Sequence, residues 1–104
     1  MKEIATMLGF AAKAGQLLLG TASVERGIKQ RQVAMVICAT DLSAKTIKNF
    51  KYWCDLNRID FFSYGFRSEL GHWVGAPERG IIGIVSKQFA SRLRQLLEDR
   101  GDQQ

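Results

Sequence analysis

Short apolar runs alternate with longer amphipathic segments along most of this chain of 104 residues. One run, residues 34–39, is apolar throughout, which is typical of a central strand covered on both faces. The longer segments repeat apolar residues at helical spacing, as Ile4, Leu8 and Ala11 do near the start. The pattern predicts strands over residues 17–19, 34–39, 59–64 and 81–85, and helices over 3–14, over 44–57 and after Thr21, Ser68 and Ser86.

This alternating order predicts an α/β fold, a three-layer α/β/α sandwich in which helices cover both faces of a roughly four-stranded sheet. Consecutive strand-helix units favour parallel neighbours, but small sheets of this kind are often mixed, so we expect a mixed sheet. A chain of this length forms one domain, expected over residues 1–100 and followed by a short polar tail at 101–104.

Residues that can hydrogen-bond to free backbone groups, or that interrupt a helix, mark where helices and loops are expected. Side-chain hydroxyls accept hydrogen bonds from the free N–H groups of a first helical turn, so they favour helix starts. On this basis caps are expected at Thr21, Ser43, Ser68 and Ser86. The stretch 75–80 contains the only proline and is expected to be a loop.

Composition is that of an ordinary globular protein, with 46% hydrophobic and 24% charged residues. The chain has no apolar run of the roughly 18 residues that a membrane helix needs, and its first residues lack a signal-peptide core, so we expect a cytoplasmic protein without membrane contact. Cys38 and Cys54 lie in apolar segments, where cysteine usually fills the core. Neither a disulfide nor a metal framework is expected.

The net charge of +5 is concentrated in one half of the chain. Residues 1–52 contain eight basic and three acidic side chains, whereas residues 53–104 contain seven of each. The excess therefore lies chiefly on the helices expected after Thr21 and Ser43. A localised basic face attracts polyanions, so this distribution favours a nucleic-acid partner.

Gly20 joins the first strand to a helix that carries Arg26 and Lys29. The free N–H groups at a helix N-terminus suit phosphate, and glycine lets a bulky anion approach the backbone closely. An ordinary strand-to-helix turn would explain the same residues, and the distribution of charge favours the phosphate-binding interpretation.

Other residues that could contact a nucleic acid are expected to have simpler roles. The three lysines on the helix over 44–57 are more typical of a solvated face than of direct contact. Trp53 and Trp73 could stack on bases, but their apolar neighbours and helical spacing favour core packing.

The residues that an enzyme would need are missing. His72 is the only histidine and lacks a nearby cysteine or paired carboxylates. No GxGxxG or GxxxxGK[ST] motif follows a strand, and Asp41 lacks the second acid that a magnesium site would need. We therefore expect no catalytic residues, no metal and no cofactor.

Five landmarks appear in a recognisable order between Met7 and Leu97. They are the stretch 8–15, Gly20 before a helix, the strand and turn 35–41, the stretch 70–75 and the loop residues 77–79. In this order they resemble the kink-turn RNA-binding ribosomal-protein family of the L-seven-Ae and L-thirty-e type, and specifically its bacterial YlxQ-like members.

The resemblance implies a sandwich that binds sharply bent RNA through two elements, residues 20–29 and the loop 77–82. In the family a basic side chain on the helix contacts the guanines at the bend, and Arg26 occupies that position here. Backbone N–H groups near Gly20 and the loop around Arg79 would hold phosphate and the flipped-out nucleotide. The implied RNA-binding residues are Gly20, Thr21, Ala22, Ser23, Arg26, Lys29, Arg79, Gly80 and Ile81.

The chain departs from the archaeal pattern at Ala22 and Ser23, where those members carry Asn and then Glu. Loss of a bidentate base contact lowers the discrimination between bases by about 1 to 3 kcal/mol. We therefore expect the chain to bind structured RNA, including ribosomal RNA, and not kink-turns alone. A protein of the ribosome or translation machinery is a further expected partner. Two alternatives remain: a protein-interaction module with a basic face, and a small-ligand binder at the carboxyl ends of the strands.

Overall fold

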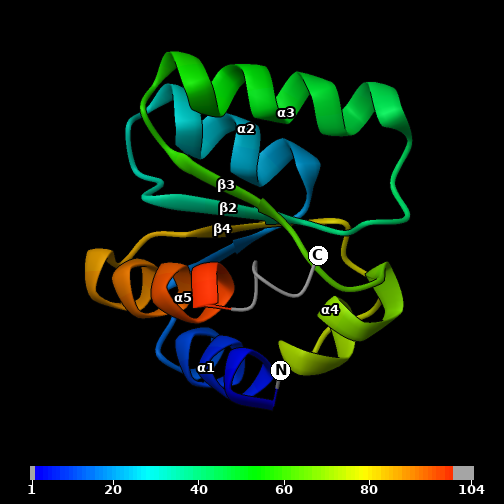
Figure 1. The fold of residues 1–104 in the computed structure, drawn as a ribbon, viewed down its shortest axis with the longest axis vertical. Helices are drawn as coiled ribbons and strands as arrows, with labels where there is room; N and C mark the ends of the chain where they lie inside the picture. The colour runs from blue at the N-terminus through cyan, green and yellow to red at the C-terminus, as the bar shows by residue number, and fades with distance from the viewer. Residues whose placement is uncertain (1, 100–104) are drawn as a thin grey trace.

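The computed structural model describes residues 2–99, and the tail predicted at 101–104 lies outside this part. Within it, five helices and four strands alternate in the predicted order (Figure 1). Their bounds are α1 (Lys2–Lys13), β1 (Leu17–Leu19), α2 (Thr21–Lys29), β2 (Met35–Cys38), α3 (Ala44–Leu56), β3 (Asp60–Ser63), α4 (Arg67–Trp73), β4 (Ile81–Ile84) and α5 (Lys87–Asp99).

The strands form one mixed sheet in the order β1-β4-β2-β3. β2 and β3 are parallel, whereas β4 is antiparallel to both of its neighbours, β1 and β2. β1 therefore runs in the same direction as β2 and β3. We call the end where these three strands finish and β4 begins the carboxyl end of the sheet, and the opposite end its amino end.

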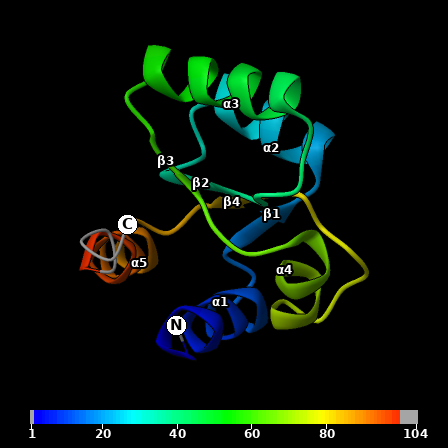
Figure 2. The same ribbon diagram turned by 45° about the vertical axis from the view of Figure 1, so that its right-hand side comes forward.

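Helices cover both faces of the sheet, which confirms the predicted three-layer sandwich (Figures 1 and 2). α2 and α3 lie on one face, and α1, α4 and α5 lie on the other. Side chains of β2 alternate between the two cores: Met35 and Ile37 pack with the three-helix layer, and Val36 and Cys38 pack with α2 and α3. β1 is only half-buried, because it is an edge strand.

Two of the four predicted helix caps are confirmed. The Ser43 hydroxyl accepts a hydrogen bond from the Thr46 N–H at 3.1 Å, and the Ser86 hydroxyl accepts one from the Phe89 N–H at 3.2 Å. Each bond satisfies one of the free donors of a first helical turn.

The caps predicted at Thr21 and Ser68 are wrong, because bonds from distant parts of the chain move both helix starts. Gly20 is the N-cap of α2, with its own N–H bonded to the Ile81 carbonyl at 2.9 Å, and Thr21 is already helical. α4 begins at Arg67, whose N–H donates to the Asp41 carboxylate at 2.9 Å, so Ser68 lies inside the helix.

Cys38 and Cys54 are free and fully buried, so their predicted core role is confirmed. Burial raises the pKa of both thiols, that of Cys54 to about 12. Because the thiolate is the reactive form, we expect iodoacetamide at pH 8 to modify neither cysteine in the folded protein and both in urea, as measured by intact mass. Rapid labelling without urea would show that the core opens readily.

Candidate nucleic-acid interface

The carboxyl end of the sheet brings together the two elements that the sequence predicted to bind RNA. In the β1–β4 pairing, Leu19 lies opposite Ile82, and the next N–H along, that of Gly20, donates to the Ile81 carbonyl at 2.9 Å. Antiparallel pairing thus places the start of α2 beside the end of the loop 75–80. The candidate residues at 20–23 and at 79–81 lie side by side as a result.

The N-terminus of α2 has unused backbone donors. Gly20 has φ 97° and ψ 160°, a conformation that residues with a Cβ rarely adopt, and a Cβ placed there would meet nothing within 4 Å. No side chain caps the helix, and the N–H groups of Thr21, Ala22 and Ser23 have no acceptor among the described residues. With the positive end of the helix dipole, these three N–H groups form a site suited to phosphate.

The two basic candidates on α2 differ in electrostatic environment. Lys29 is 3.1 Å from the Glu25 carboxylate, one turn earlier, although its side chain stays 71% exposed. Arg26 is exposed and has no ion-pair partner among the described residues. An exposed ion pair is weak, so Lys29 keeps part of its attraction for anions, but Arg26 is the fully available cation.

The loop 75–80 is held between α4 and the turn that follows β2. Gly71 of α4 packs directly against the Pro77 carbonyl, and Gly80 packs against the Leu42 side chain. The Gly80 carbonyl also accepts a hydrogen bond from the Ala39 N–H at 2.8 Å. This segment is therefore fixed in place beside the start of α2.

Arg79, one of the residues that the resemblance implies for RNA binding, is half-buried. Its backbone N–H donates to the Arg67 carbonyl at 3.2 Å, and its Nη1 donates to the Glu78 carbonyl at 3.0 Å. Its Nε is buried and has no acceptor among the described residues. A buried donor without a partner costs about 1–3 kcal/mol, so the guanidinium is held there at a cost to stability.

Arg67 and Phe66 also lie at this end of the sheet and were not among the residues predicted from the sequence. Arg67 forms an ion pair with Asp41, with 3.3 Å between Nε and Oδ2. Phe66, the N-cap of α4, is 56% exposed beside them. Their position after β2 and β3 is the available signal, since the turns that follow parallel strands gather at the same end of a sheet.

The remaining basic and aromatic residues have the surroundings predicted for a solvated lysine face and for packed tryptophans. Lys45 and Lys48 are exposed, and Lys51 lies 3.8 Å from Asp55 in an exposed pair. Trp53 and Trp73 are half-buried and pack on Phe50 and Tyr64, respectively.

The part of the sandwich formed by α2, α3 and the turns that directly follow them carries a large excess of positive charge. Its acidic side chains are Glu25 and Asp55. Its basic side chains are Arg26, Lys29, Arg31, Lys45, Lys48, Lys51 and Arg58. The excess charge seen in the sequence therefore forms one face of the molecule, which includes the helix whose N-terminus is suited to phosphate.

Residues 2–99 contain neither a side-chain cluster suited to a metal ion nor a helix suited to crossing a membrane. No group of three or more His, Cys, Asp or Glu side chains in this range is arranged to hold a metal ion. None of the helices in this range has the length and apolar character needed to cross a membrane.

A model of the ribosomal protein L7Ae/L30e/S12e/Gadd45 family matches residues 2–93. The chain belongs to this family. Two relatives, each called RNA-binding protein YlxQ, align with it over 92 residues. That of Enterococcus faecium is 28% identical and covers 88% of each chain. That of Bacillus subtilis (strain 168) is 25% identical and covers 88% of this chain and 92% of the relative.

Solved structures show the same L7Ae-type fold. A protein with unknown function from Bacillus halodurans C superimposes with a TM-score of 0.91 at 32% identity, covering 94% of this chain and 99% of the other. The Giardia lamblia 15.5kD RNA binding protein superimposes with a TM-score of 0.81 at 12% identity, covering 94% and 84%. At that identity the second match shows the fold alone.

We expect Arg79→Met to weaken RNA binding by this L7Ae-family chain while leaving its stability nearly unchanged. Methionine retains the apolar volume, and losing the hydrogen bond to the Glu78 carbonyl offsets the gain from removing the buried, unpaired Nε–H. The free energy of unfolding in urea should therefore change by less than about 1 kcal/mol. Loss of one charged contact should weaken RNA binding about tenfold, as measured by fluorescence anisotropy. Arg92→Met, an exposed change on α5, is the control, and equal affinities for the two variants would remove Arg79 from the interface.

Proposed function

We propose that this protein is a non-catalytic RNA-binding protein that holds structured RNA at the carboxyl end of its sheet. The observation that carries this proposal is the Gly20–Ile81 hydrogen bond, because it places three free helix N–H groups beside the loop 75–80. Arg26, exposed and unpaired in the described part of the chain, adds a free cation on the same helix. The family and the names of the two curated relatives support RNA as the partner.

Each part of the interface has a distinct task in this proposal. The N–H groups of residues 21–23 bind a backbone phosphate at the positive end of α2. Arg26 lies about 6 Å further along the helix than Ala22, at about 1.5 Å per residue, where its planar guanidinium contacts the O6 and N7 atoms of a guanine. The loop residues Gly80 and Ile81 pack on a base that is turned out of its stack at a bend in the RNA.

The preferred RNA in this proposal is bent, as a kink-turn is, but selection for the bend is weaker than in archaeal relatives. Ala22 has no polar side chain, and the Ser23 hydroxyl offers a single hydrogen bond to a base edge. Losing a bidentate contact reduces discrimination by about 1 to 3 kcal/mol and leaves the phosphate contacts intact. Ribosomal RNA in the cytoplasm is the proposed setting, with a protein of the translation machinery as a further partner.

The test is a binding titration against a kink-turn RNA and a straight duplex of equal length, each at two salt concentrations. Preference for the kink-turn that persists at the higher salt would support recognition of the bend. Equal and steeply salt-dependent binding to both would leave a general RNA-binding surface and reject recognition of the bend. Absence of binding to either RNA would reject the proposal in favour of an acidic protein partner.

A further inference from the structure

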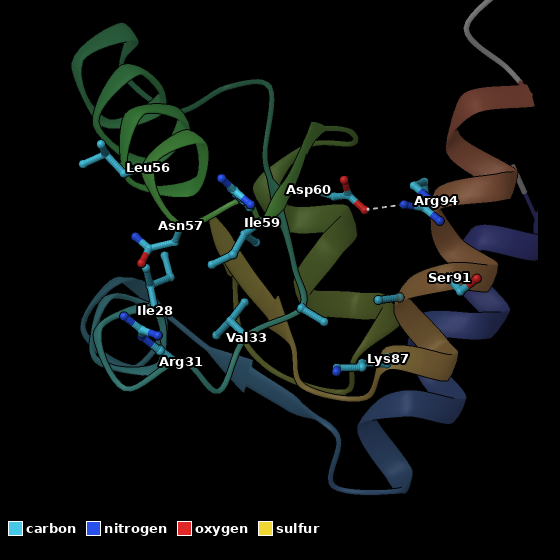
Figure 3. Close-up of a pocket in the computed structure, with 13 residues that line it drawn as sticks. Ile28, Arg31, Val33, Leu56, Asn57, Ile59, Asp60, Lys87, Ser91 and Arg94 are labelled. Carbon is cyan, nitrogen blue, oxygen red and sulfur yellow. Dashed lines mark hydrogen bonds and ion pairs between the residues drawn. The ribbon is translucent and has the colours of Figure 1, made fainter.

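A cleft of about 540 Å³ opens at the amino end of the sheet, at the opposite end of α2 from the proposed RNA site. One wall is formed by the C-terminal ends of α2 and α3, which contribute Ile28 and Asn57, and the other by α5 (Figure 3). Its size is within the range of small-molecule binding sites. None of the RNA-binding candidates lines it.

The cleft carries an excess of positive charge. Arg31, Arg58 and Lys87 line it, and none of them has a carboxylate partner among the described residues. Asp60 is the only acidic residue among those lining the cleft, and it is already 3.2 Å from Arg94. In Figure 3, Arg31 stands on the α2 wall, and Lys87 extends from α5 toward Val33 across the cleft. Three uncompensated cations from three separate segments therefore surround one space.

Helix dipoles do not explain all three cations. Arg31 and Arg58 follow the C-terminal ends of α2 and α3, where a positive charge is favourable. Lys87, however, is the first residue of α5, where the dipole disfavours a cation. The N–H groups of Lys87 and Gln88 also have no acceptor among the described residues. An anion in the cleft would neutralise the charge of the lysine and accept hydrogen bonds from these N–H groups.

The backbone at the two arginines is also unusual. Arg31 has φ 60° and Arg58 has φ 58°, the left-handed conformation in which glycine normally ends a helix, and no other non-glycine residue in the described part of the chain has a positive φ. Glycine would relieve the conformational cost at both positions but would supply no guanidinium. The two strained positions lie on the same cleft.

We propose that this cleft binds the phosphate groups of a nucleotide, either a free nucleoside phosphate or a residue of an RNA strand. Arg31 and Arg58 bind phosphate oxygens with their planar guanidinium groups, and Lys87 with the first N–H groups of α5 binds from the other wall. The exposed Leu56 and the half-buried Ile59 offer an apolar surface to the organic part of the ligand. The site does not depend on RNA binding at the other end of α2.

The test variant is the double change Arg31→Gly and Arg58→Gly. Glycine adopts the left-handed conformation freely, so the resistance of the protein to urea should be unchanged or higher, and a loss of binding cannot be attributed to unfolding. The matched control is Lys13→Ala with Arg92→Ala, which removes the same charge from exposed positions outside the cleft.

Two probes distinguish the sources of phosphate: ATP, followed by calorimetry and by amide NMR shifts, and a kink-turn RNA with an extended duplex arm, followed by anisotropy. The double glycine variant should bind one of them about tenfold more weakly than the control does. Weaker ATP binding by the double glycine variant would identify the ligand as a free nucleotide. If wild type does not bind ATP and the variant binds RNA more weakly, the ligand is an RNA strand. The proposal is overturned if wild type binds neither probe, or if the variant and the control bind both equally. Arg26→Ala tests the interface at the other end of α2 and should leave ATP binding unchanged, so the two proposals fail separately.

Discussion

Replacing Gly71 by alanine is expected to lower the free energy of unfolding by about 3 kcal/mol, although alanine favours an exposed helix by about 1 kcal/mol over glycine. The reversal arises because a Cβ on Gly71 would overlap the Pro77 carbonyl oxygen and lie 2.8 Å from its carbon. These are backbone atoms, so relief requires α4 and the loop 75–80 to move apart. Urea denaturation followed by circular dichroism measures the effect.

Ser68→Ala on the same helix is the control for Gly71→Ala. Ser68 is exposed, so its replacement should change the unfolding free energy by less than about 0.5 kcal/mol. The Gly71 variant should also bind RNA more weakly, because the displaced loop supplies Gly80 and Ile81 to the proposed interface. Unchanged or increased stability of the Gly71 variant would show that the loop is not packed tightly on α4.

The second large effect is expected from charge reversal at Arg26. Arg26→Glu removes a cation and places a carboxylate near the free N–H groups of α2, so RNA affinity at low salt should fall by about 100-fold or more. Folding should be unaffected, because Arg26 is exposed and has no partner within the described residues. Fluorescence anisotropy with a labelled kink-turn RNA measures the change.

Lys48→Glu is the matched control for Arg26→Glu. Lys48 is exposed on α3 within the same basic face, so reversal there changes the net charge equally without touching the start of α2. We expect a smaller loss of affinity, visible mainly as a shallower salt dependence. Equal losses at both positions would mean that RNA binds the basic face in general and that Arg26 has no special role.

The sequence predicted the fold well where local pattern determines structure. The apolar run at 34–39 identified the central strand, and Ser43 and Ser86 form the helix caps expected of them. The prediction failed at Thr21 and Ser68 because bonds from Ile81 and Asp41 move the helix starts. Such bonds depend on tertiary structure, so no local pattern reveals them.

Only part of the candidate interface could be predicted from the sequence. Residues 20–29 have a local signature in the glycine, the helix start and the basic side chains, but their contact with Ile81 depends on strand order, which hydrophobic periodicity does not reveal. Partial burial of Arg79 depends on that packing too. The left-handed arginines at 31 and 58 gave no sequence signal, because glycine or asparagine is the residue that normally marks such a position.

The place of β4 between β1 and β2 has a consequence for how the protein is made. Residues are added in chain order, so β1, β2 and β3 leave the ribosome before the strand that joins β1 to them. At about 5–20 residues per second, Ile81 follows Gly20 by roughly 3–12 seconds. Throughout that interval α2 and its basic side chains lack the loop that completes the proposed interface. Selective RNA binding at the proposed interface therefore requires that β4 has entered the sheet.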